Sequence, residues 1–235
     1  MLREVRALTF DCYGTLIDWE TGLLGILNAW AQSVGATERD DALLEAYGRH
    51  ESAIEAESPA LIYSHVVRET MRHIARELDA EAASDWVERL AGSIGEWPAF
   101  SDSAESLLRL KQRYQLGILS NVDHASFAGS ARKLMVDFDW VVTAEDVGSY
   151  KPSLRNFRVM LDRLNAAGIE QHEVVHVAQS LFHDHAPAQQ LGLRTVWIDR
   201  RLGKPGHGST PAPPAGIRYD AAFPSMRTFA SWATA

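Results

Sequence analysis

The stretch Leu8-Thr9-Phe10-Asp11-Cys12-Tyr13-Gly14-Thr15-Leu16 decides the fold of this chain. The apolar run 5–10 is typical of a buried strand, and an acid follows it immediately. Open α/β sheets place their ligands beside the carboxyl ends of their strands, so we expect Asp11 at such an edge. Gly14 lets the backbone turn sharply there. We interpret Asp11 as a nucleophile, although this stretch alone also allows an acid that only caps the next helix.

Composition indicates a soluble globular protein and argues against several partners. The 235 residues, 46% hydrophobic and 23% charged, suffice for one core domain with a smaller insert. A net charge of −8 without a basic block disfavours nucleic acid and anionic membranes. Cys12 is the single cysteine, residues 1–4 leave no room for a signal peptide, and no apolar run approaches membrane-spanning length. We therefore expect a cytoplasmic protein.

Helical periodicity fills the segment after the first predicted strand. Apolar residues recur at helical spacing in the ranges 21–34, 40–57, 61–78 and 84–94, the last with Ser84 as a candidate N-cap. No strand signal interrupts them between residues 17 and 97. We therefore expect an inserted all-helical cap domain, residues 17–97, on a core domain made of residues 1–16 and 98–235.

Strands and helices alternate after the insert. Strands are predicted at 114–120, 139–143, 174–178 and 195–198, with helices between them, including 153–165 with Pro152 in its first turn and 181–191. This alternation predicts an α/β fold, a Rossmann-like three-layer core around a parallel sheet. The Gly- and Pro-rich range 203–216 is interpreted as a surface loop, and 223–232 as a final helix after a short edge segment.

Polar side chains stand where the predicted strands end. Asp11 and Thr15 follow the first strand, Ser120 and Asn121 end the second, Lys151 follows the third, and the range 179–184 follows the fourth. Parallel neighbouring strands would bring all of them to one edge of the sheet. A lysine there keeps a carboxylate ionised and neutralises an anionic substrate, while hydroxyl and amide donors hold charged oxygens. The series therefore favours the nucleophile interpretation.

Four motifs resemble those of the haloacid dehalogenase superfamily. They are Asp11-x-Tyr13-Gly14-Thr15-Leu16, Ser120-Asn121, Tyr150-Lys151-Pro152 and Val177-Ala178-Gln179-Ser180-x-x-His183-Asp184. The resemblance covers residues 5–199 and places the helical insert where the superfamily keeps its cap. Phosphatases of the superfamily have a second Asp where Tyr13 stands and a Mg²⁺-binding acid near Gln179. A tyrosine, with an ordinary pKa near 10, is a poor acid at neutral pH, and Mg²⁺ prefers carboxylates. The resemblance therefore points to the metal-free type II (S)-2-haloacid dehalogenases, without a metal or cofactor.

This resemblance implies a hydrolase that acts by displacement at carbon. Asp11 would attack the α-carbon of a small 2-substituted carboxylate, expel a halide and form an ester that water hydrolyses to the 2-hydroxy acid. Lys151 would pair with Asp11, while Thr15, Ser120 and Asn121 would position the nucleophile and the substrate. Related enzymes are commonly homodimers, so the resemblance also implies a homodimer.

The resemblance assigns the remaining site residues less directly. Water activation goes to His183 and Asp184, with Ser180 where the dehalogenases have Asn. Arg49 is the candidate cap arginine for the substrate, and Trp19 and Tyr13 are candidates to line the pocket. The alternatives are a solvent-facing Arg49 and a Trp19 that packs at the cap hinge. A rival zinc site would use four histidines: His172, His176, His183 and His185.

A second resemblance leaves the leaving group open. The ranges 10–22, 146–152 and 180–185 are similar to the azetidine-2-carboxylate hydrolases, relatives of the dehalogenases that open a strained ring by the same carboxylate attack. The choice then lies in cap residues such as Trp19, Arg49, His50 and Tyr63. We also keep two less favoured hypotheses, a Mg²⁺-dependent phosphatase and a non-catalytic binding protein on the same fold.

Overall fold

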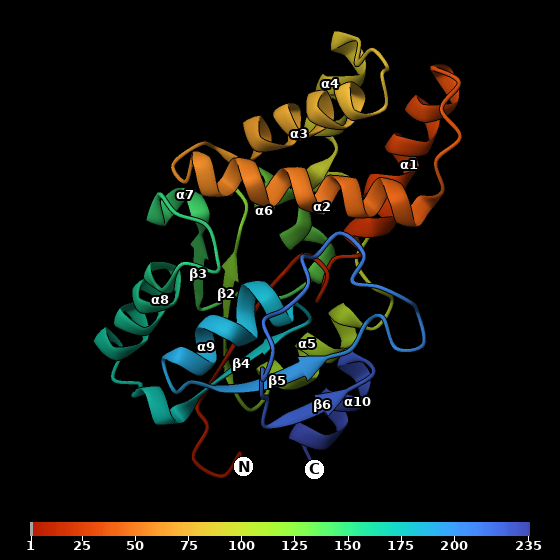
Figure 1. Ribbon diagram of the computed structural model, residues 1–235. Coiled ribbons are helices and arrows are strands. Elements are labelled where there is room, and N and C mark those ends of the chain that lie inside the picture. The colour runs from red at the N-terminus through yellow and green to blue at the C-terminus, as the bar shows by residue number, and fades with distance from the viewer. Residues whose placement is uncertain (1) are drawn as a thin grey trace.

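A six-stranded parallel sheet forms the core of the computed structural model, which describes residues 2–235 (Figure 1). The strand order is β3-β2-β1-β4-β5-β6, so β1 lies in the interior between β2 and β4. Phe10 is in register with Ile118 and Val177, which places the residue after it at the carboxyl edge. The expected α/β fold is confirmed. The strands are β1 (Ala7–Phe10), β2 (Gln115–Ser120), β3 (Trp140–Thr143), β4 (Val174–Ala178), β5 (Arg194–Ile198) and β6 (Ala221–Phe223).

Helices cover both faces of the sheet, as a three-layer core requires. Helices α5 (Ser103–Lys111), α6 (His124–Leu134) and α10 (Met226–Ala233) share one apolar cluster with strand residues such as Leu8 and Ile118. Helices α8 (Leu154–Ala166) and α9 (Ala186–Gln190) belong to a second cluster with Leu119 and Val142. Neighbouring residues Ile118 and Leu119 thus face opposite layers, as strand alternation dictates. The short helix α7 (Ala144–Val147) follows β3 directly.

An all-helical cap lies over the carboxyl ends of the strands (Figure 1). It consists of α1 (Trp19–Ser33), α2 (Asp40–Glu57), α3 (Tyr63–Glu77), α4 (Ser84–Gly92) and the 3₁₀ turn Ile94–Glu96. Its two linkers run side by side, because Asp18 N donates to Pro98 O at 2.7 Å and Phe100 N donates to Leu16 O at 3.0 Å. We propose residues 17–97 as the extent of the cap domain.

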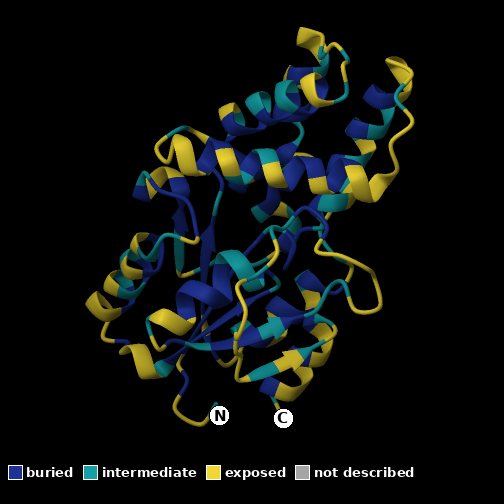
Figure 2. Cartoon of the chain, viewed as in Figure 1, coloured by how far each residue is buried: buried dark blue, intermediate teal, exposed yellow. Residues whose placement is uncertain are grey.

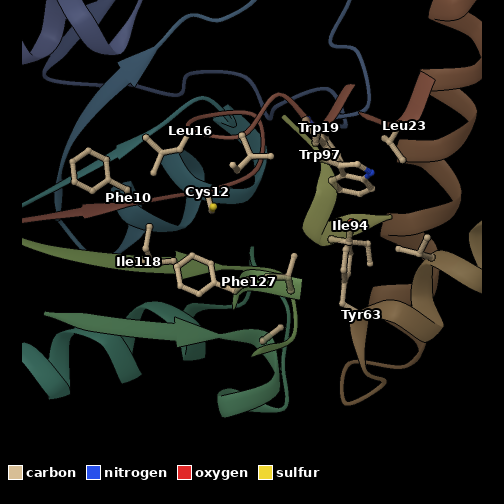
Figure 3. Close-up of a cluster of buried hydrophobic side chains, with 14 of the residues drawn as sticks. Phe10, Cys12, Leu16, Trp19, Leu23, Tyr63, Ile94, Trp97, Ile118 and Phe127 are labelled. Carbon is tan, nitrogen blue, oxygen red and sulfur yellow. The ribbon is translucent and has the colours of Figure 1, made fainter. Parts of the chain in front are cut away.

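Burial joins the cap to the core. Figure 2 shows buried residues concentrated along the sheet and exposed residues on the outer turns of the helices. One apolar cluster runs from Phe10 in β1 through Leu16 and Trp97 to Leu23 of the cap (Figure 3). Cys12 is fully buried within it, and burial raises the pKa of its thiol well above the usual value, which keeps the thiol protonated and unreactive.

Three local predictions differ from the structure. Ser84 is the first helical residue of α4, and Ala83 precedes it without a side-chain cap. Pro152 precedes helix α8, whose N-cap is Ser153. The predicted helix 181–191 is divided into the π-helical turn Leu181–His185 and α9, since Pro187 has no N–H to continue the ladder of hydrogen bonds. No helix within residues 2–235 has the length and hydropathy of a membrane span.

Candidate active site

A buried triad of charged side chains occupies the carboxyl edge of β1. Lys151 Nζ donates to Asp11 Oδ1 at 2.8 Å, to Asp184 Oδ1 at 2.7 Å and to Leu119 O at 2.9 Å. An ammonium group has three N–H donors, so these contacts use all of them. Lys151 therefore holds the two carboxylates in place and has no donor left for a ligand.

Thr15 fixes the second oxygen of the central carboxylate. Its hydroxyl donates to Asp11 Oδ2 at 2.6 Å and accepts from Gln179 N at 2.9 Å. The chain reverses between Asp11 and Thr15 because Gly14 adopts a φ of 91°, a left-handed conformation that favours glycine. Both carboxylate oxygens are thus oriented by neighbours, as expected for a nucleophile that attacks from a defined direction.

Burial and charge set the ionisation of the triad. Burial raises the pKa of Asp11, and the nearby Asp184 adds to this effect, while Lys151 and the Thr15 hydroxyl oppose it. Burial would also raise the pKa of Asp184, but Lys151 and His176 hold it well below its usual range. The two carboxylates likewise keep the pKa of Lys151 above its usual value despite burial. Asp184 and Lys151 are therefore charged at neutral pH, and Asp11 takes up a proton first as the pH falls.

Two unpartnered polar atoms lie beside the triad. Asp184 Oδ2 and His183 Nε2 are buried and have no hydrogen-bond partner within residues 2–235, and both residues line the same pocket as Asp11. Burial lowers the pKa of His183 to about 4, so its ring is neutral near pH 7. The Ser180 hydroxyl oxygen lies 3.3 Å from His183 Nδ1 and is uncharged. Asp184 Oδ2 offers an acceptor for a water molecule, and His183 Nε2 accepts from it or donates to it according to the tautomer of the ring.

Ser120 and Asn121 have different environments at the end of β2. Asn121 Oδ1 accepts from Lys151 N at 2.7 Å, and Asn121 Nδ2 donates to Lys151 O at 3.0 Å, so this side chain clamps the lysine loop. The Ser120 hydroxyl is buried in the pocket lining and has no partner among the described residues. Ser120 is therefore available for a ligand, whereas Asn121 is largely committed to the fold.

Tyr13 and Trp19 supply aromatic walls. The Tyr13 hydroxyl lies 2.8 Å from Ser130 Oγ in α6. The Tyr13 ring packs edge-on against Trp97, with 5.7 Å between the ring centroids. Burial raises the pKa of the Tyr13 hydroxyl well above the usual value. Trp19 lines the pocket and packs edge-on against Tyr47 at 6.0 Å. Tyr13 therefore contributes its ring to the pocket wall, and its hydroxyl stays protonated at neutral pH.

The cap wall is acidic, and Arg49 is not part of it. Arg49 NH2 lies 2.6 Å from Glu77 Oε1 on the exposed side of the cap, and His50 also contacts Glu77. The prediction that Arg49 reaches the substrate is corrected: the α2 residues in the pocket are Glu51 and Glu55, joined by Tyr63 of α3. Glu51 and Glu55 are one helical turn apart and share a face, whereas Arg49 is on another face. This four-residue spacing was visible in the sequence.

The range 203–216 is more than a surface loop. Thr210 lines the pocket, and Ser209 is fully buried against α2, where a Cβ at Gly48 would lie 2.2 Å from the Ser209 carbonyl oxygen. The Arg201–Glu20 ion pair, at 2.6 Å, ties the start of this segment to α1. Figure 1 shows the segment, in blue, between the sheet and α1 and α2. It closes one side of the pocket.

Known proteins share this architecture. The family model described as haloacid dehalogenase-like hydrolase matches residues 5–192. The chain belongs to this family. It is 27% identical over 219 residues to (S)-2-haloacid dehalogenase 4A of Burkholderia cepacia, and this match covers 90% of each chain. It is 25% identical over 207 residues to (S)-2-haloacid dehalogenase 1 of Pseudomonas sp. (strain CBS-3), and this match covers 86% of this chain and 87% of the relative. A solved dehalogenase with an intermediate complex superposes with a TM-score of 0.81 at 24% identity, over 99% and 98% of the two chains. The protein is a hydrolase.

Within this haloacid dehalogenase-like hydrolase, the histidines of the rival zinc hypothesis do not converge. His176 Nε2 contacts Asp184 at 3.0 Å, His185 contacts Thr195 at 3.0 Å, and His172 is exposed at the other end of β4. No group of three or more His, Cys, Asp or Glu in residues 2–235 has the geometry of a metal site. The Gln179 side chain, close to Gly14, lines the pockets outside the triad.

Proposed function

We propose that this protein is a metal-independent hydrolase that displaces the substituent at C2 of a small carboxylic acid, as the 2-haloacid dehalogenases do. The observation that carries the proposal is the Asp11 carboxylate held between Lys151 and Thr15, beside unpartnered Asp184 Oδ2. The pocket that contains Asp11 has a volume of about 40 Å³, which favours a small substrate.

The reaction proceeds in two steps. An Asp11 oxygen attacks C2 in line with the bond to the substituent, that bond breaks with its electron pair on the leaving group, and the centre inverts. The result is an ester between Asp11 and C2. A water molecule then attacks the ester carbonyl, giving up a proton toward Asp184 Oδ2 or His183 Nε2, and releases the 2-hydroxy acid. A halide leaves without taking up a proton. The reaction therefore needs no general acid at the position of Tyr13.

A single turnover in ¹⁸O-water tests the ester. Enzyme in excess is incubated with L-2-chloropropionate, digested and analysed by peptide mass spectrometry. The label is expected in the carboxyl group of Asp11, because water attacks the ester there, while the product hydroxyl carries ¹⁶O from Asp11. Label found in the product alone would remove the ester mechanism.

A ring nitrogen is a second candidate leaving group. The acidic cap wall, Glu51 and Glu55, favours it, since a halide or a carboxylate gains nothing from two nearby acids. Opening of L-azetidine-2-carboxylate by the same attack would give 4-amino-2-hydroxybutanoate. Parallel assays with L-2-chloropropionate and L-azetidine-2-carboxylate, by halide release and by primary-amine formation, distinguish the two.

A further inference from the structure

Two acids of the cap line the same pocket as the nucleophile. Glu51 and Glu55 are 4% and 5% exposed, and both line the pocket that contains Asp11. Tyr63 donates to Glu51 Oε1 at 2.6 Å, and Asn121 Nδ2 lies 3.4 Å from Glu55 Oε2. Within residues 2–235, neither carboxyl forms an ion pair with a lysine, arginine or histidine. Buried carboxyls without a cation are unfavourable, so their retention in the pocket calls for a function.

The charge balance of the pocket disfavours a purely anionic ligand. Lys151 supplies the one permanent positive charge among the described lining residues, and its three N–H donors are already used. Burial raises the pKa of Glu51 to about 7 and that of Glu55 well above its usual value, so the empty site relieves its excess negative charge by taking up protons. The acids that line the pocket are Asp11, Glu51, Glu55 and Asp184.

The core side of the pocket carries an unused donor. The Ser120 hydroxyl belongs to a residue that is 1% exposed, lines the same pocket and has no partner among the described residues. A carboxylate oxygen of a ligand would satisfy it. The pocket thus has a free donor from the core and acidic acceptors from the cap, and Asp11 lines the same pocket. This polarity matches a ligand with a negative end and a positive end.

We propose that Glu51 and Glu55 form a subsite for a protonated amine, so that the pocket prefers small zwitterionic 2-substituted carboxylates over purely anionic ones. The proposal rests on the proposed function, because it takes Asp11 as the group that attacks C2. The substrate carboxylate binds toward Ser120, and its ammonium group donates to the two cap carboxyls. Each charge-assisted hydrogen bond of this kind contributes about 10- to 100-fold in affinity.

Binding of two matched, unreactive probes tests the subsite in the unmodified protein. L-Alanine and propionate share the carboxylate and the methyl group, and differ in the ammonium group at C2. Calorimetric titration at pH 8 and low salt is expected to give at least about 10-fold tighter binding of L-alanine. Equal binding, or tighter binding of propionate, overturns the proposal. L-Alanine carries only an unstrained ammonium group at C2 and propionate carries none, so neither probe is expected to form an ester with Asp11, and this outcome is independent of the ¹⁸O experiment.

Two variants and a control assign the effect to the cap acids. Glu55→Gln and Glu51→Gln keep the side-chain shape but remove the charge, and each is expected to reduce the L-alanine preference about 10-fold or more while propionate binding strengthens. Glu77→Gln removes a charge from the exposed side of the same cap and is expected to leave the preference unchanged. Circular dichroism checks folding of each variant. An unchanged preference in both folded pocket variants overturns the assignment, and an unfolded variant leaves the decision to the other variant and the unmodified protein.

Discussion

Replacing Lys151 with methionine removes the single cation from two buried carboxylates. Asp11 and Asp184 lie 2.8 and 2.7 Å from Lys151 Nζ, and all three side chains are nearly inaccessible to solvent. Removing one partner of a buried ion pair costs about 3–5 kcal/mol, because an uncompensated charge remains. Methionine retains the apolar stem, so the lost charge dominates. We expect the free energy of unfolding at pH 8 to fall by this amount and activity to be abolished.

The loss of stability in the Lys151→Met variant depends on pH in a defined direction. Without Lys151, burial raises the pKa of Asp11 above that of the unfolded chain, while Asp184 keeps its contact with His176, so the folded variant binds more protons than the unfolded one. Its stability is then highest at low pH and falls as the pH rises through the folded-state pKa values. The deficit relative to the unmodified protein should therefore be smaller at pH 5 than at pH 8.

Urea unfolding followed by tryptophan fluorescence measures this deficit at both pH values. Lys111→Met is the matched control, because Lys111 pairs with Asp139 at the surface and such pairs contribute about 0–1 kcal/mol. A deficit below about 1 kcal/mol at pH 8, or one equal at both pH values, would show that solvent or another group already compensates the carboxylates.

Three further substitutions probe the same site. Thr15→Val removes the 2.6 Å hydrogen bond to Asp11 and should move the acidic limb of the pH–rate profile upward, since that bond opposes the rise in pKa; an unmoved limb contradicts this. Asp184→Asn should slow ester hydrolysis more than ester formation, so that mass spectrometry of the protein detects an accumulated adduct on Asp11; a variant without adduct that remains active points to another base. Tyr150→Phe removes the hydroxyl donated to Leu61 O of the cap and should raise KM with little change in kcat; a KM equal to that of the unmodified protein shows that this contact does not hold the cap closed.

The sequence was sufficient for the core of the site. A buried apolar run followed by Asp11 marks the end of a strand, and alternation of strands and helices places other strand ends beside it. Lys151 lies far away in sequence, yet the parallel topology brings it to the same edge. These inferences need only the positions of the strands and the direction in which neighbouring strands run. Hydrophobic periodicity and the rules for connecting strands largely determine both.

The cap wall could not be predicted to the same degree. Periodicity shows that α2 is amphipathic, but it does not say which face meets the pocket, so Arg49 was chosen over Glu51 and Glu55. Acids at a buried position also contradict the usual distribution of charged residues. Thr210 was missed because a Gly- and Pro-rich range carries no signal for the tertiary contact that buries its neighbour Ser209.

The paired linkers between cap and core have a kinetic consequence. Because the two attachment points, near Asp18 and Pro98, are hydrogen-bonded to each other, we expect any opening of the cap to pivot about this pair of linkers. Asp11 lies before the first linker and is held within the core by Lys151 and Thr15, so opening of the cap would admit solvent without displacing the nucleophile. Turnover is then expected to depend on solvent viscosity wherever cap opening is slower than chemistry.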